Sequence, residues 1–286
     1  MKIINGKVIA ERIKCELKDE ITKIITDTGC RSPKLSTILV GEDPGSKTYV
    51  AMKQRDANLI GIENQVTHLS ETVTESELSS IVKTLNNDDS VDGILIQLPL
   101  PLPHRLSQRV ILDTIAPEKD VDGLTSLSGG LIMNHYENHL ITCTPKGILQ
   151  LLDEYGVPLS GANIVVVNHS SIVGRPLAQL LLNRGATVSV CHSRTRDLRQ
   201  YTLMADVIIT AVGKANLITS DMVKEGAVVI DAGYARINGK VCGDTDFEAL
   251  IPKVKLITPP VGGVGPMTIA HLLTNTVMAW KKHFSL

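Results

Sequence analysis

Short apolar runs rich in Val, Ile and Leu alternate along the whole chain with longer stretches in which apolar residues recur at helical spacing. The short runs predict β-strands at Leu35–Val40, Gly93–Leu98, Asn163–Asn168, Thr187–Cys191, Val207–Val212, Ala227–Asp231 and Val254–Thr258. The periodic stretches predict helices at Lys47–Ile60, Glu75–Leu85, Pro176–Arg184 and Met267–His283. Gly61 and Gly185 each follow one of these stretches, where glycine commonly ends a helix. Strands that are apolar on both faces and alternate with helices are typical of covered parallel sheets, so we expect an α/β protein.

The segment 99–145 separates two such α/β regions. It has no long periodic stretch and contains PLPLP, PEKDVDG, SLSGG and TPKG, which are rich in turn-forming residues. We therefore expect two domains with the active-site cleft between them: an amino-terminal α/β catalytic domain at 1–139 and a Rossmann-type dinucleotide-binding domain with a parallel sheet at 140–266. The last helix, within 267–286, is compatible with either domain, and we assign it to the first.

Composition and charge exclude several classes of protein. The 286 residues carry 29 Lys and Arg against 30 Asp and Glu, a net charge of −1, which gives no overall field for nucleic acid or an anionic membrane. No apolar run approaches the roughly 20 residues that a membrane helix needs, and the first residues, MKIINGKVIAERIK, contain no apolar signal core. The five cysteines are scattered without a CxxC pair, which favours reduced thiols over disulfides or a zinc site. We expect a soluble cytoplasmic protein.

A candidate phosphate-binding turn follows the strand Asn163–Asn168. The strand leads into HSSIVG, and Arg175-Pro176 then opens a helix, an arrangement that can direct backbone N–H groups and a helix N-terminus at a pyrophosphate. Asn168 stands where the first Gly of the dinucleotide fingerprint is expected, and Asn tolerates positive φ better than most residues. The alternative is an ordinary connection between a strand and a helix.

The end of the next strand indicates which dinucleotide binds. Sites that prefer NAD place an Asp or Glu there, on the ribose 2′-hydroxyl. Here the strand Thr187–Cys191 is followed by His192-Ser193-Arg194-Thr195-Arg196, which has no carboxylate. Hydroxyl and guanidinium groups suit a 2′-phosphate instead, so we favour NADP over NAD. A solvated basic loop is the alternative interpretation.

Two polar side chains in the amino-terminal domain are candidates for proton transfer. Tyr49 and Lys53 are four residues apart on a predicted helix and therefore share a face. A lysine that is partly desolvated beside a phenol can exchange protons near neutral pH, whereas an exposed lysine beside a tyrosine has no such role. Gln97 interrupts an apolar strand near its carboxyl end, where ligand sites of parallel sheets lie, although it also suits a cap for local backbone groups.

Two further segments carry candidate binding groups. Lys119-Asp120-Val121-Asp122-Gly123 places two carboxylates on one side if it is extended, and a turn is the alternative. The loop 258–268 combines three glycines in four positions with three prolines, which favours close approach of a planar ligand over simple flexibility. The chain has no HxxxH, HExxH or GxSxG motif, so neither metal-dependent hydrolysis nor a serine nucleophile is indicated.

Taken together, these segments resemble one family over essentially the full chain. The matching stretches are VGEDPGSKTYVAMK, DGILIQLPLP, PEKDVDG, TPKG, SSIVGRPLAQLLL, CHSRT, ADVIITAVGK, GAVVIDAG, GDTDF and PPVGGVGPMT. Their order and spacing are similar to those of the bifunctional methylenetetrahydrofolate dehydrogenase/methenyltetrahydrofolate cyclohydrolase family. The resemblance implies hydride transfer from 5,10-methylenetetrahydrofolate to NADP, followed by hydrolysis of the methenyl cation to 10-formyltetrahydrofolate.

The resemblance also implies roles for individual residues. Lys53 assists proton transfer in the hydrolysis, Gln97 tunes Lys53, Asp122 holds the pterin ring and Tyr49 packs against the folate. The implied substrate-binding set is Tyr49, Lys53, Gln97, Leu98, Pro99, Asp122, Gly262, Gly263 and Pro266. The implied cofactor-binding set is Asn168, His169, Ser170, Ile172, Gly174, Ser193, Arg194 and Tyr234. The family's members are commonly homodimers paired through the cofactor domain. The missing metal motifs and the balanced charge lead us to expect no metal and no nucleic-acid or membrane partner.

Three departures from the family pattern gather around the cofactor. Asn168 and His169 replace the usual Gly and Arg or small residue, Pro259-Pro260-Val261 replaces the usual order in the glycine loop, and Tyr234 lies in a segment that is usually GIN. NADP preference therefore stays open, and a cyclohydrolase with weak or NAD-dependent dehydrogenase activity is one alternative.

Two other classes of protein remain as alternatives. A different two-domain NADP-dependent dehydrogenase that acts on a hydroxy- or keto-acid requires an anion-binding arginine, for which Arg105 and Arg109 are the nearby candidates. The second alternative is a protein that senses a dinucleotide without catalysis. That function would not explain why the chain contains the set of Lys53, Gln97 and Asp122.

Overall fold

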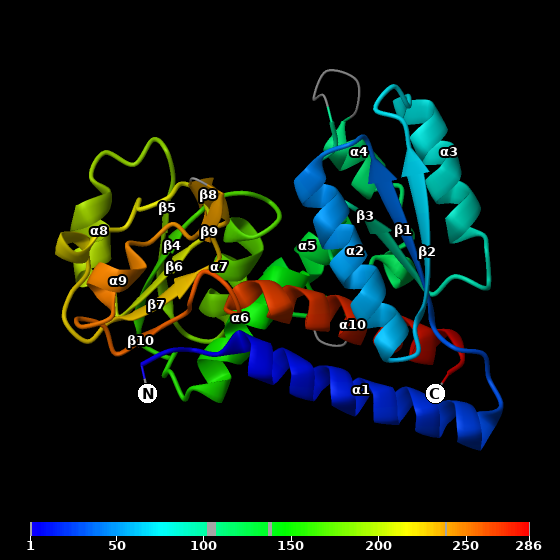
Figure 1. Cartoon of the computed structure of the whole chain (residues 1–286), viewed down its shortest axis with the longest axis horizontal. Coiled ribbons are helices and arrows are strands. Elements are labelled where there is room, and N and C mark those ends of the chain that lie inside the picture. The colour runs from blue at the N-terminus through cyan, green and yellow to red at the C-terminus, as the bar shows by residue number, and fades with distance from the viewer. Residues whose placement is uncertain (1, 102–106, 137–138, 238, 286) are drawn as a thin grey trace. The chain divides into compact units, whose positions relative to one another are not determined.

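The computed structural model describes residues 2–101, 107–136, 139–237 and 239–285 (Figure 1). The chain divides into two compact units, one formed by Met1–Ala10 with Cys143–Thr268 and the other by Glu11–Thr142 with Ile269–Leu286. We call them the five-stranded unit and the three-stranded unit after their main sheets. Helices α1 (Gly6–Thr28) and α10 (Val264–His283) contribute residues to both units. The first ten residues thus belong with the second α/β region, whereas the sequence assigns them to the first.

The five-stranded unit contains a parallel sheet in the order β10-β7-β6-β4-β5. Its strands are β4 (Asn163–Val167), β5 (Thr187–Cys191), β6 (Val207–Thr210), β7 (Val228–Asp231) and β10 (Leu256–Ile257). Its helices are α6 (Cys143–Glu154), α7 (Gly174–Asn183), α8 (Leu198–Met204) and α9 (Phe247–Leu250), and Figure 1 shows them on both sides of the sheet. The chain adds β5 on one side of β4 and then β6 on the other side, so the strand order reverses between β4 and β6. Doubly wound folds bind ligands at such a reversal.

Shorter elements complete this unit. The hairpin of β8 (Ala235–Ile237) and β9 (Lys240–Cys242) is antiparallel, and η2 (Ser220–Met222) is a single 3₁₀ turn. Ile3 pairs with Ile257 and so extends the edge of the main sheet beyond β10. The core is aliphatic, because β4 and β6 bury Val, Ile and Thr side chains on both faces. The predicted α/β fold with parallel sheets is confirmed.

The three-stranded unit has a parallel sheet in the order β2-β1-β3. Its strands are β1 (Lys34–Val40), β2 (Glu63–Leu69) and β3 (Gly93–Ile96), and its further elements are α2 (Pro44–Leu59), α3 (Glu75–Asn86), α4 (Gln108–Leu112), η1 (Pro117–Lys119) and α5 (Ser126–Met133). The connections β1–α2–β2 and β2–α3–β3 return each strand to the same direction. The carboxyl ends of these strands therefore share one edge, where the candidate catalytic residues lie.

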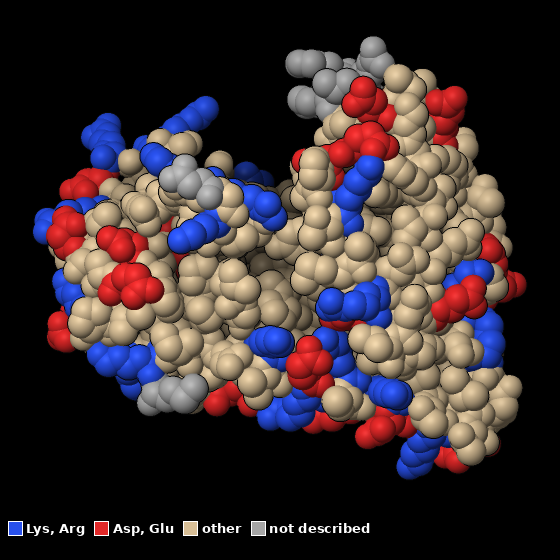
Figure 2. Space-filling model, viewed as in Figure 1, with Lys and Arg blue, Asp and Glu red and all other residues tan. Residues whose placement is uncertain are grey.

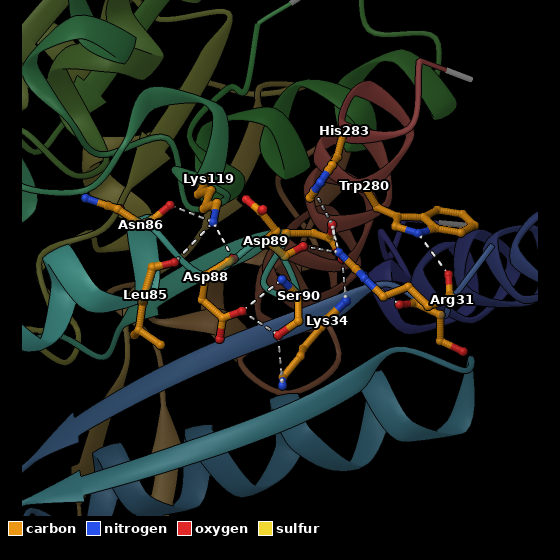
Figure 3. A network of polar contacts seen from close by, with 12 residues as sticks. Arg31, Lys34, Leu85, Asn86, Asp88, Asp89, Ser90, Lys119, Trp280 and His283 are labelled. Atoms are coloured by element: carbon orange, nitrogen blue, oxygen red, sulfur yellow. Dashed lines mark hydrogen bonds and ion pairs between the residues drawn. The ribbon is translucent and has the colours of Figure 1, made fainter.

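A polar network at the opposite end of β3 fixes several segments of the three-stranded unit (Figure 3). The buried carboxylate of Asp92 accepts bonds of 2.6 and 2.8 Å from the Arg31 guanidinium, and the Nδ1 atom of His283 in α10 lies 3.2 Å away. Nearby, the Lys119 ammonium donates to the backbone carbonyls of Leu85, Asn86 and Asp88 at the end of α3. Burial lowers the pKa of Lys119, although neighbouring carboxylates oppose this effect.

The surface carries both signs of charge. Figure 2 shows Lys and Arg side chains interspersed with Asp and Glu over the visible face, in keeping with the balanced composition. Among the described residues, no helix combines the length and the apolar character needed to cross a lipid bilayer. The described residues also contain no group of three or more His, Cys, Asp or Glu side chains arranged to hold a metal ion.

Candidate active site and cofactor cavity

Lys53 and Gln97 lie together in the three-stranded unit. The Lys53 Nζ atom donates to the Gln97 Oε1 atom over 3.0 Å, and Gln97 Nε2 donates to the Leu98 carbonyl over 2.7 Å. Lys53 is only 8% exposed, so the alternative of an exposed helical lysine is wrong. Gln97 combines the two roles considered for it, because one end of its amide caps the backbone while the other contacts Lys53.

The sequence positions Lys53 through the start of α2. Asp43 caps the helix by accepting a bond of 2.7 Å from the Ser46 N–H, and Pro44 occupies its first turn. Further along α2, Lys53 is buried together with Val50 and Ala57. Gln97 comes directly after β3, and its own N–H donates to Ile38 of β1, which holds it at the carboxyl edge of the sheet.

Tyr49 and Asp56 flank Lys53 on α2. Tyr49 is half-buried one turn earlier, as the spacing predicts. Burial alone would raise the pKa of Asp56, but hydrogen bonds from Lys14 and Arg55 outweigh it and leave that pKa below its ordinary value. The Lys14–Asp56 ion pair, at 2.9 Å, fastens α2 to α1 within this unit. The helix that carries the candidate lysine is therefore held by a buried charge pair as well as by apolar packing.

The two carboxylates of the KDVDG segment have separate environments. Asp120 is 1% exposed and accepts hydrogen bonds from the Leu124 N–H, the Thr125 N–H and the Ser128 hydroxyl. The segment forms η1 and a turn rather than an extended strand, so the two carboxylates do not act as one cluster. Asp120 is thus structural, and Asp122, which is half-buried, is the member of the pair that suits a ligand.

The turn that carries Asp122 is anchored on both sides. Asn275 of α10, which is fully buried, donates to the Val121 and Ile141 carbonyls over 2.9 and 2.8 Å. Gly123 has a φ of +66°, and a Cβ atom there would lie 2.5 Å from the Thr142 backbone nitrogen. Of the other predicted substrate residues in this unit, Leu98 and Pro99 follow Gln97 and are joined by a cis peptide bond.

The predicted substrate residues Gly262, Gly263 and Pro266 belong to the five-stranded unit. A Cβ atom on Gly263 would lie 2.5 Å from the Pro259 carbonyl oxygen, and one on Gly6 would lie 2.0 Å from the Gly263 oxygen. The glycines of this loop therefore allow two segments of the chain to approach each other closely. The sequence analysis predicted instead that they allow a planar ligand to approach the backbone. Helix α10 begins at Val264, so Pro266 lies in its first turn.

Asn168 organises the turn between β4 and α7 through its side chain. Its Oδ1 atom accepts bonds from the Ser170 N–H (2.7 Å) and the Gly174 N–H (3.1 Å), while its Nδ2 atom donates to the Ala211 carbonyl. Asn168 does not have positive φ, so the physical reason that the sequence offers for an Asn here is wrong. The amide ties the turn to the end of β6 instead.

This turn opens onto a cavity of about 570 Å³ within the five-stranded unit. The cavity is lined by Val167, Asn168, His169, Ser170, Cys191, His192, Ser193, Thr195, Leu198, Val212, Lys214 and Leu217. These residues lie at the ends of β4, β5 and β6 or in the segments after them, and these three strands meet where the sheet order reverses. The lining contains no carboxylate in the part of the chain that the structure describes.

The loop after β6 is held against the cavity by a buried aspartate. Asp244, which is fully buried, accepts bonds from the Val212 N–H (2.6 Å), the Lys214 N–H (2.8 Å) and the Thr210 hydroxyl (2.7 Å). Asp231 lies nearby at the end of β7, and its carboxylate accepts bonds from the backbone N–H groups of Gly233, Asp244 and Thr245. Burial raises the pKa of Asp231.

Four of the predicted cofactor residues do not line this cavity. Gly174 is buried at the start of α7, where a Cβ atom would lie 2.1 Å from the Asn168 carbonyl oxygen, so its role is to let the turn close. Arg194 lies between the lining residues Ser193 and Thr195 along the chain, and Ile172 is two positions from Ser170. Tyr234 is 42% exposed, and its hydroxyl accepts a bond from Arg236.

Two family models match the chain in succession. Residues 4–122 match the catalytic domain of tetrahydrofolate dehydrogenase/cyclohydrolase, and residues 142–284 match its NAD(P)-binding domain. The chain belongs to the tetrahydrofolate dehydrogenase/cyclohydrolase family. The predicted resemblance is confirmed.

Relatives in this family match the chain over nearly its whole length. The bifunctional protein FolD of Halothermothrix orenii is 49% identical over 283 residues, which is 99% of both proteins. The crystal structure of the FolD enzyme of Campylobacter jejuni is 47% identical and covers 99% of both chains with a TM-score of 0.95. The Trypanosoma brucei FolD structure, solved with NADP and an inhibitor, is 34% identical, covers 99% of this chain and 98% of its own, and has a TM-score of 0.94.

Several cavity residues of this family member are missed by sequence reasoning that follows the fingerprint motif alone. Val212, Lys214 and Leu217 line the cavity beside the predicted residues. The signal that identifies them is topological, because in a parallel sheet the segments that follow neighbouring strands share one edge. The short segment Val212–Lys214, at the end of the predicted strand Val207–Val212, meets that criterion.

The arginines required by the hydroxy- or keto-acid alternative receive no support. Arg109 donates to the Leu124 carbonyl over 2.8 Å and lies 3.5 Å from Asp113, so its charge is engaged within the three-stranded unit. Arg105 lies outside the described residues.

Proposed function

We propose that this chain is a bifunctional enzyme of folate one-carbon metabolism. It oxidises 5,10-methylenetetrahydrofolate to 5,10-methenyltetrahydrofolate with NADP and then hydrolyses the product to 10-formyltetrahydrofolate. The observation that carries this proposal is the buried contact between Lys53 and Gln97 in a chain that matches both domains of the family.

The cavity of the five-stranded unit fits NADP. It lies at the reversal of strand order, it contains histidine, hydroxyl and lysine groups, and β5 ends without the carboxylate that holds a ribose 2′-hydroxyl. When bound, NADP supplies the ring carbon that accepts the hydride. The protein's own part is to hold the turn at Asn168 and the loop at Lys214 in place, which the buried carboxylate of Asp244 does for the loop.

In the hydrolytic step, Lys53 acts on the attacking water. Water adds to the methenyl carbon of the cation and must lose a proton, which a neutral amine at Nζ can accept. Burial of Lys53 disfavours its charged form, and a substrate cation nearby disfavours it further. Gln97 presents its carbonyl oxygen to Nζ and so keeps the amine oriented. Nζ then gives this proton to N5 as the bond between N5 and the former methenyl carbon breaks. The hydroxyl of the adduct loses its proton to solvent as the formyl C=O forms, so one proton is released overall.

The remaining residues position the folate. The half-buried Asp122 carboxylate suits the amino and ring N–H groups of a pterin, since a carboxylate accepts two parallel hydrogen bonds. Tyr49 offers a flat apolar surface one helical turn from Lys53. Leu98, Pro99, Gly262, Gly263 and Pro266 complete the proposed substrate-binding set.

Paired rate measurements on the purified chain test the proposal. We expect NADPH formation from 5,10-methylenetetrahydrofolate and, in a separate assay, loss of the absorbance of 5,10-methenyltetrahydrofolate without any dinucleotide. The dehydrogenase assay is repeated with NAD, and we expect a higher kcat/KM with NADP. Hydrolysis without reduction of either dinucleotide would leave only the cyclohydrolase half of the proposal. The absence of both reactions would refute it.

We also propose that the enzyme is a homodimer paired through the five-stranded unit. Strand β5 is at the edge of its sheet, and an edge strand presents backbone groups that a second strand can pair with. Around it, Leu182 of α7, Val190 of β5 and Met204 of α8 are 49%, 40% and 59% exposed. A second copy of this edge is the partner that suits both the apolar side chains and the unpaired strand.

Val190→Lys is expected to weaken this dimer by about 30-fold or more, because it puts a charge at the centre of an apolar interface. Analytical ultracentrifugation over a concentration series measures the change. Met133→Lys is the matched control, since Met133 is an exposed apolar residue on α5 of the other unit and is expected to leave association unchanged. A monomeric wild-type protein at micromolar concentration would contradict the proposal.

A further inference from the structure

Lys119, the last residue of η1, is a buried lysine that binds the end of helix α3 (Figure 3). It is 7% exposed, and its Nζ atom donates to the carbonyl oxygens of Leu85, Asn86 and Asp88 over 3.1, 2.9 and 2.8 Å. An ammonium group has three N–H donors, so these three bonds use all of them. The side chain therefore binds the main chain and has no donor left for a ligand.

The end of α3 is a favourable place for this cation. The last carbonyl groups of a helix lack partners within the helix and carry the negative end of its dipole. Burial lowers the pKa of Lys119, and the nearby carboxylates of Asp88 and Asp89 act in the opposite direction. The contact also joins two distant segments, because Leu85 and Lys119 are 34 residues apart in the sequence. Lys119 thus connects α3 with the segment that leads to Asp122.

This connection lies next to the carboxylate that is proposed to bind the folate. Asp122 comes three residues after Lys119, and Val121 between them is fully buried. A Cβ atom on Gly93 would lie 2.6 Å from the Val121 Cγ1 atom, so the valine packs directly against the start of β3. The Val121 carbonyl also accepts a bond of 2.9 Å from Asn275. The half-buried Asp122 therefore extends from a turn whose first residues are fixed by Lys119 and Val121.

We propose that Lys119 is a positioning residue for folate binding, because its three bonds to the end of α3 determine where the turn presents the Asp122 carboxylate. The inference rests on the proposed function, since it assumes that Asp122 binds the pterin ring. A carboxylate that accepts two parallel hydrogen bonds must be held to within roughly 0.5 Å of the productive position. Lys119 supplies that precision through the backbone and needs no contact with the substrate.

Lys119→Met keeps an unbranched side chain of similar volume but removes all three N–H donors. We expect the KM values for 5,10-methylenetetrahydrofolate and 5,10-methenyltetrahydrofolate to rise about tenfold, because the turn loses its attachment to α3. The kcat of hydrolysis is expected to change by less than about twofold, since the contact between Lys53 and Gln97 is intact. A lysine with a merely structural role would lower kcat through loss of folded enzyme and leave both KM values unchanged.

A double-mutant cycle shows whether Lys119 acts through Asp122. In an Asp122→Ala background, Lys119→Met is expected to change kcat/KM for hydrolysis by less than about twofold, whereas independent residues would have additive effects. Lys119→Arg keeps a cation with several N–H donors and is expected to recover most of the folate affinity. Lys83→Met is the matched control, because Lys83 is an exposed lysine in the last turn of α3 and should leave both KM values unchanged. If Lys119→Met does not fold, Lys119→Gln, which retains two N–H donors on a shorter side chain, takes its place in the cycle.

Equilibrium binding separates this inference from the proposed function. Calorimetric titration with 5-formyltetrahydrofolate, which undergoes neither reaction, is expected to show a Kd about tenfold higher in Lys119→Met, with the Kd of NADP unchanged. If that weakening is observed but no turnover occurs, the inference stands and the proposed activities fail. If wild type catalyses both reactions while Lys119→Met binds folate as wild type does, the inference is overturned and the proposed function stands. Additive effects in the cycle, or a wild-type chain that does not bind 5-formyltetrahydrofolate, would overturn the inference equally.

Discussion

Lys53→Met is expected to reduce hydrolysis of 5,10-methenyltetrahydrofolate by about 10²- to 10⁴-fold, the range that a general acid–base group contributes. Methionine fills a similar volume, so the buried site stays packed, but it has no lone pair on nitrogen to accept the proton from water. Hydride transfer to NADP needs no such proton acceptor. We therefore expect NADPH formation from 5,10-methylenetetrahydrofolate to fall much less than hydrolysis.

The measurement compares both reactions in wild type, Lys53→Met and a matched control. Lys47→Met serves as that control, because Lys47 is an exposed lysine on the same helix, with a side chain that is 44% exposed and pairs with Glu42. It is expected to leave both rates close to those of wild type. Gln97→Ala should lower hydrolysis by less than Lys53→Met does, since the amine remains but loses the oxygen that orients it. Equal loss of both reactions in Lys53→Met would contradict the assigned role of the lysine.

The order of strands and helices was predictable because the fold buries its parallel strands on both faces. β5 has the predicted bounds, β1 begins one residue earlier than predicted, and the other five predicted strands are shorter than expected at their ends. In β4, for example, the strand ends at the apolar residue Val167. Asn168, which was predicted to be its last residue, belongs instead to the turn that opens onto the cavity. Strand β2 is missed, because its sequence ENQVTHL is polar and it lies at the edge of its sheet.

The long helix α1 is missed for a different reason. Its buried face is formed by Ile9, Ile13, Leu17 and Ile21, which are spaced four residues apart and are each less than 9% exposed. That spacing is visible in the sequence, but charged residues fill the positions between and obscure the narrow apolar stripe. A helix of this kind is identified by the period of its few apolar residues, not by its average composition.

The candidate site was only partly predictable. Lys53 and Gln97 are far apart in the sequence, and only the return of β3 to the side of β1 brings Gln97 to α2. Asn168 was identified as a substitute for glycine, but its function depends on an amide that reaches the Ala211 carbonyl, a contact between segments 43 residues apart. Long-range contacts of this type have no local sequence pattern.

The second large effect is expected from the polar network of Figure 3. The Asp92 side chain is fully buried, and it accepts a bidentate contact from Arg31 together with a bond of 2.8 Å from the Lys34 N–H. Arg31 is also bound by its neighbours, because its carbonyl accepts from Trp280 and its guanidinium lies 5.2 Å from the centre of the Phe284 ring. The hydrogen bonds to Asp92 raise the pKa of Arg31, so the guanidinium stays charged at all ordinary pH values.

Arg31→Met is expected to lower the free energy of unfolding by about 3–5 kcal/mol, because it leaves a buried carboxylate without its main counter-charge. Chemical denaturation followed by circular dichroism measures the loss. The double variant Arg31→Met/Asp92→Leu removes both charges and is expected to recover part of the stability, since the cost comes from the unpaired charge rather than from the missing bond. Arg12→Met is the surface control, because Arg12 and Glu16 form an exposed pair 3.7 Å apart whose loss should cost less than about 1 kcal/mol. If Arg31→Met lowers the free energy of unfolding no more than Arg12→Met does, the ion pair of Arg31 and Asp92 does not stabilise the fold. The hydrogen bonds of Asp92 with Lys34 and His283 would then be sufficient for its buried carboxylate.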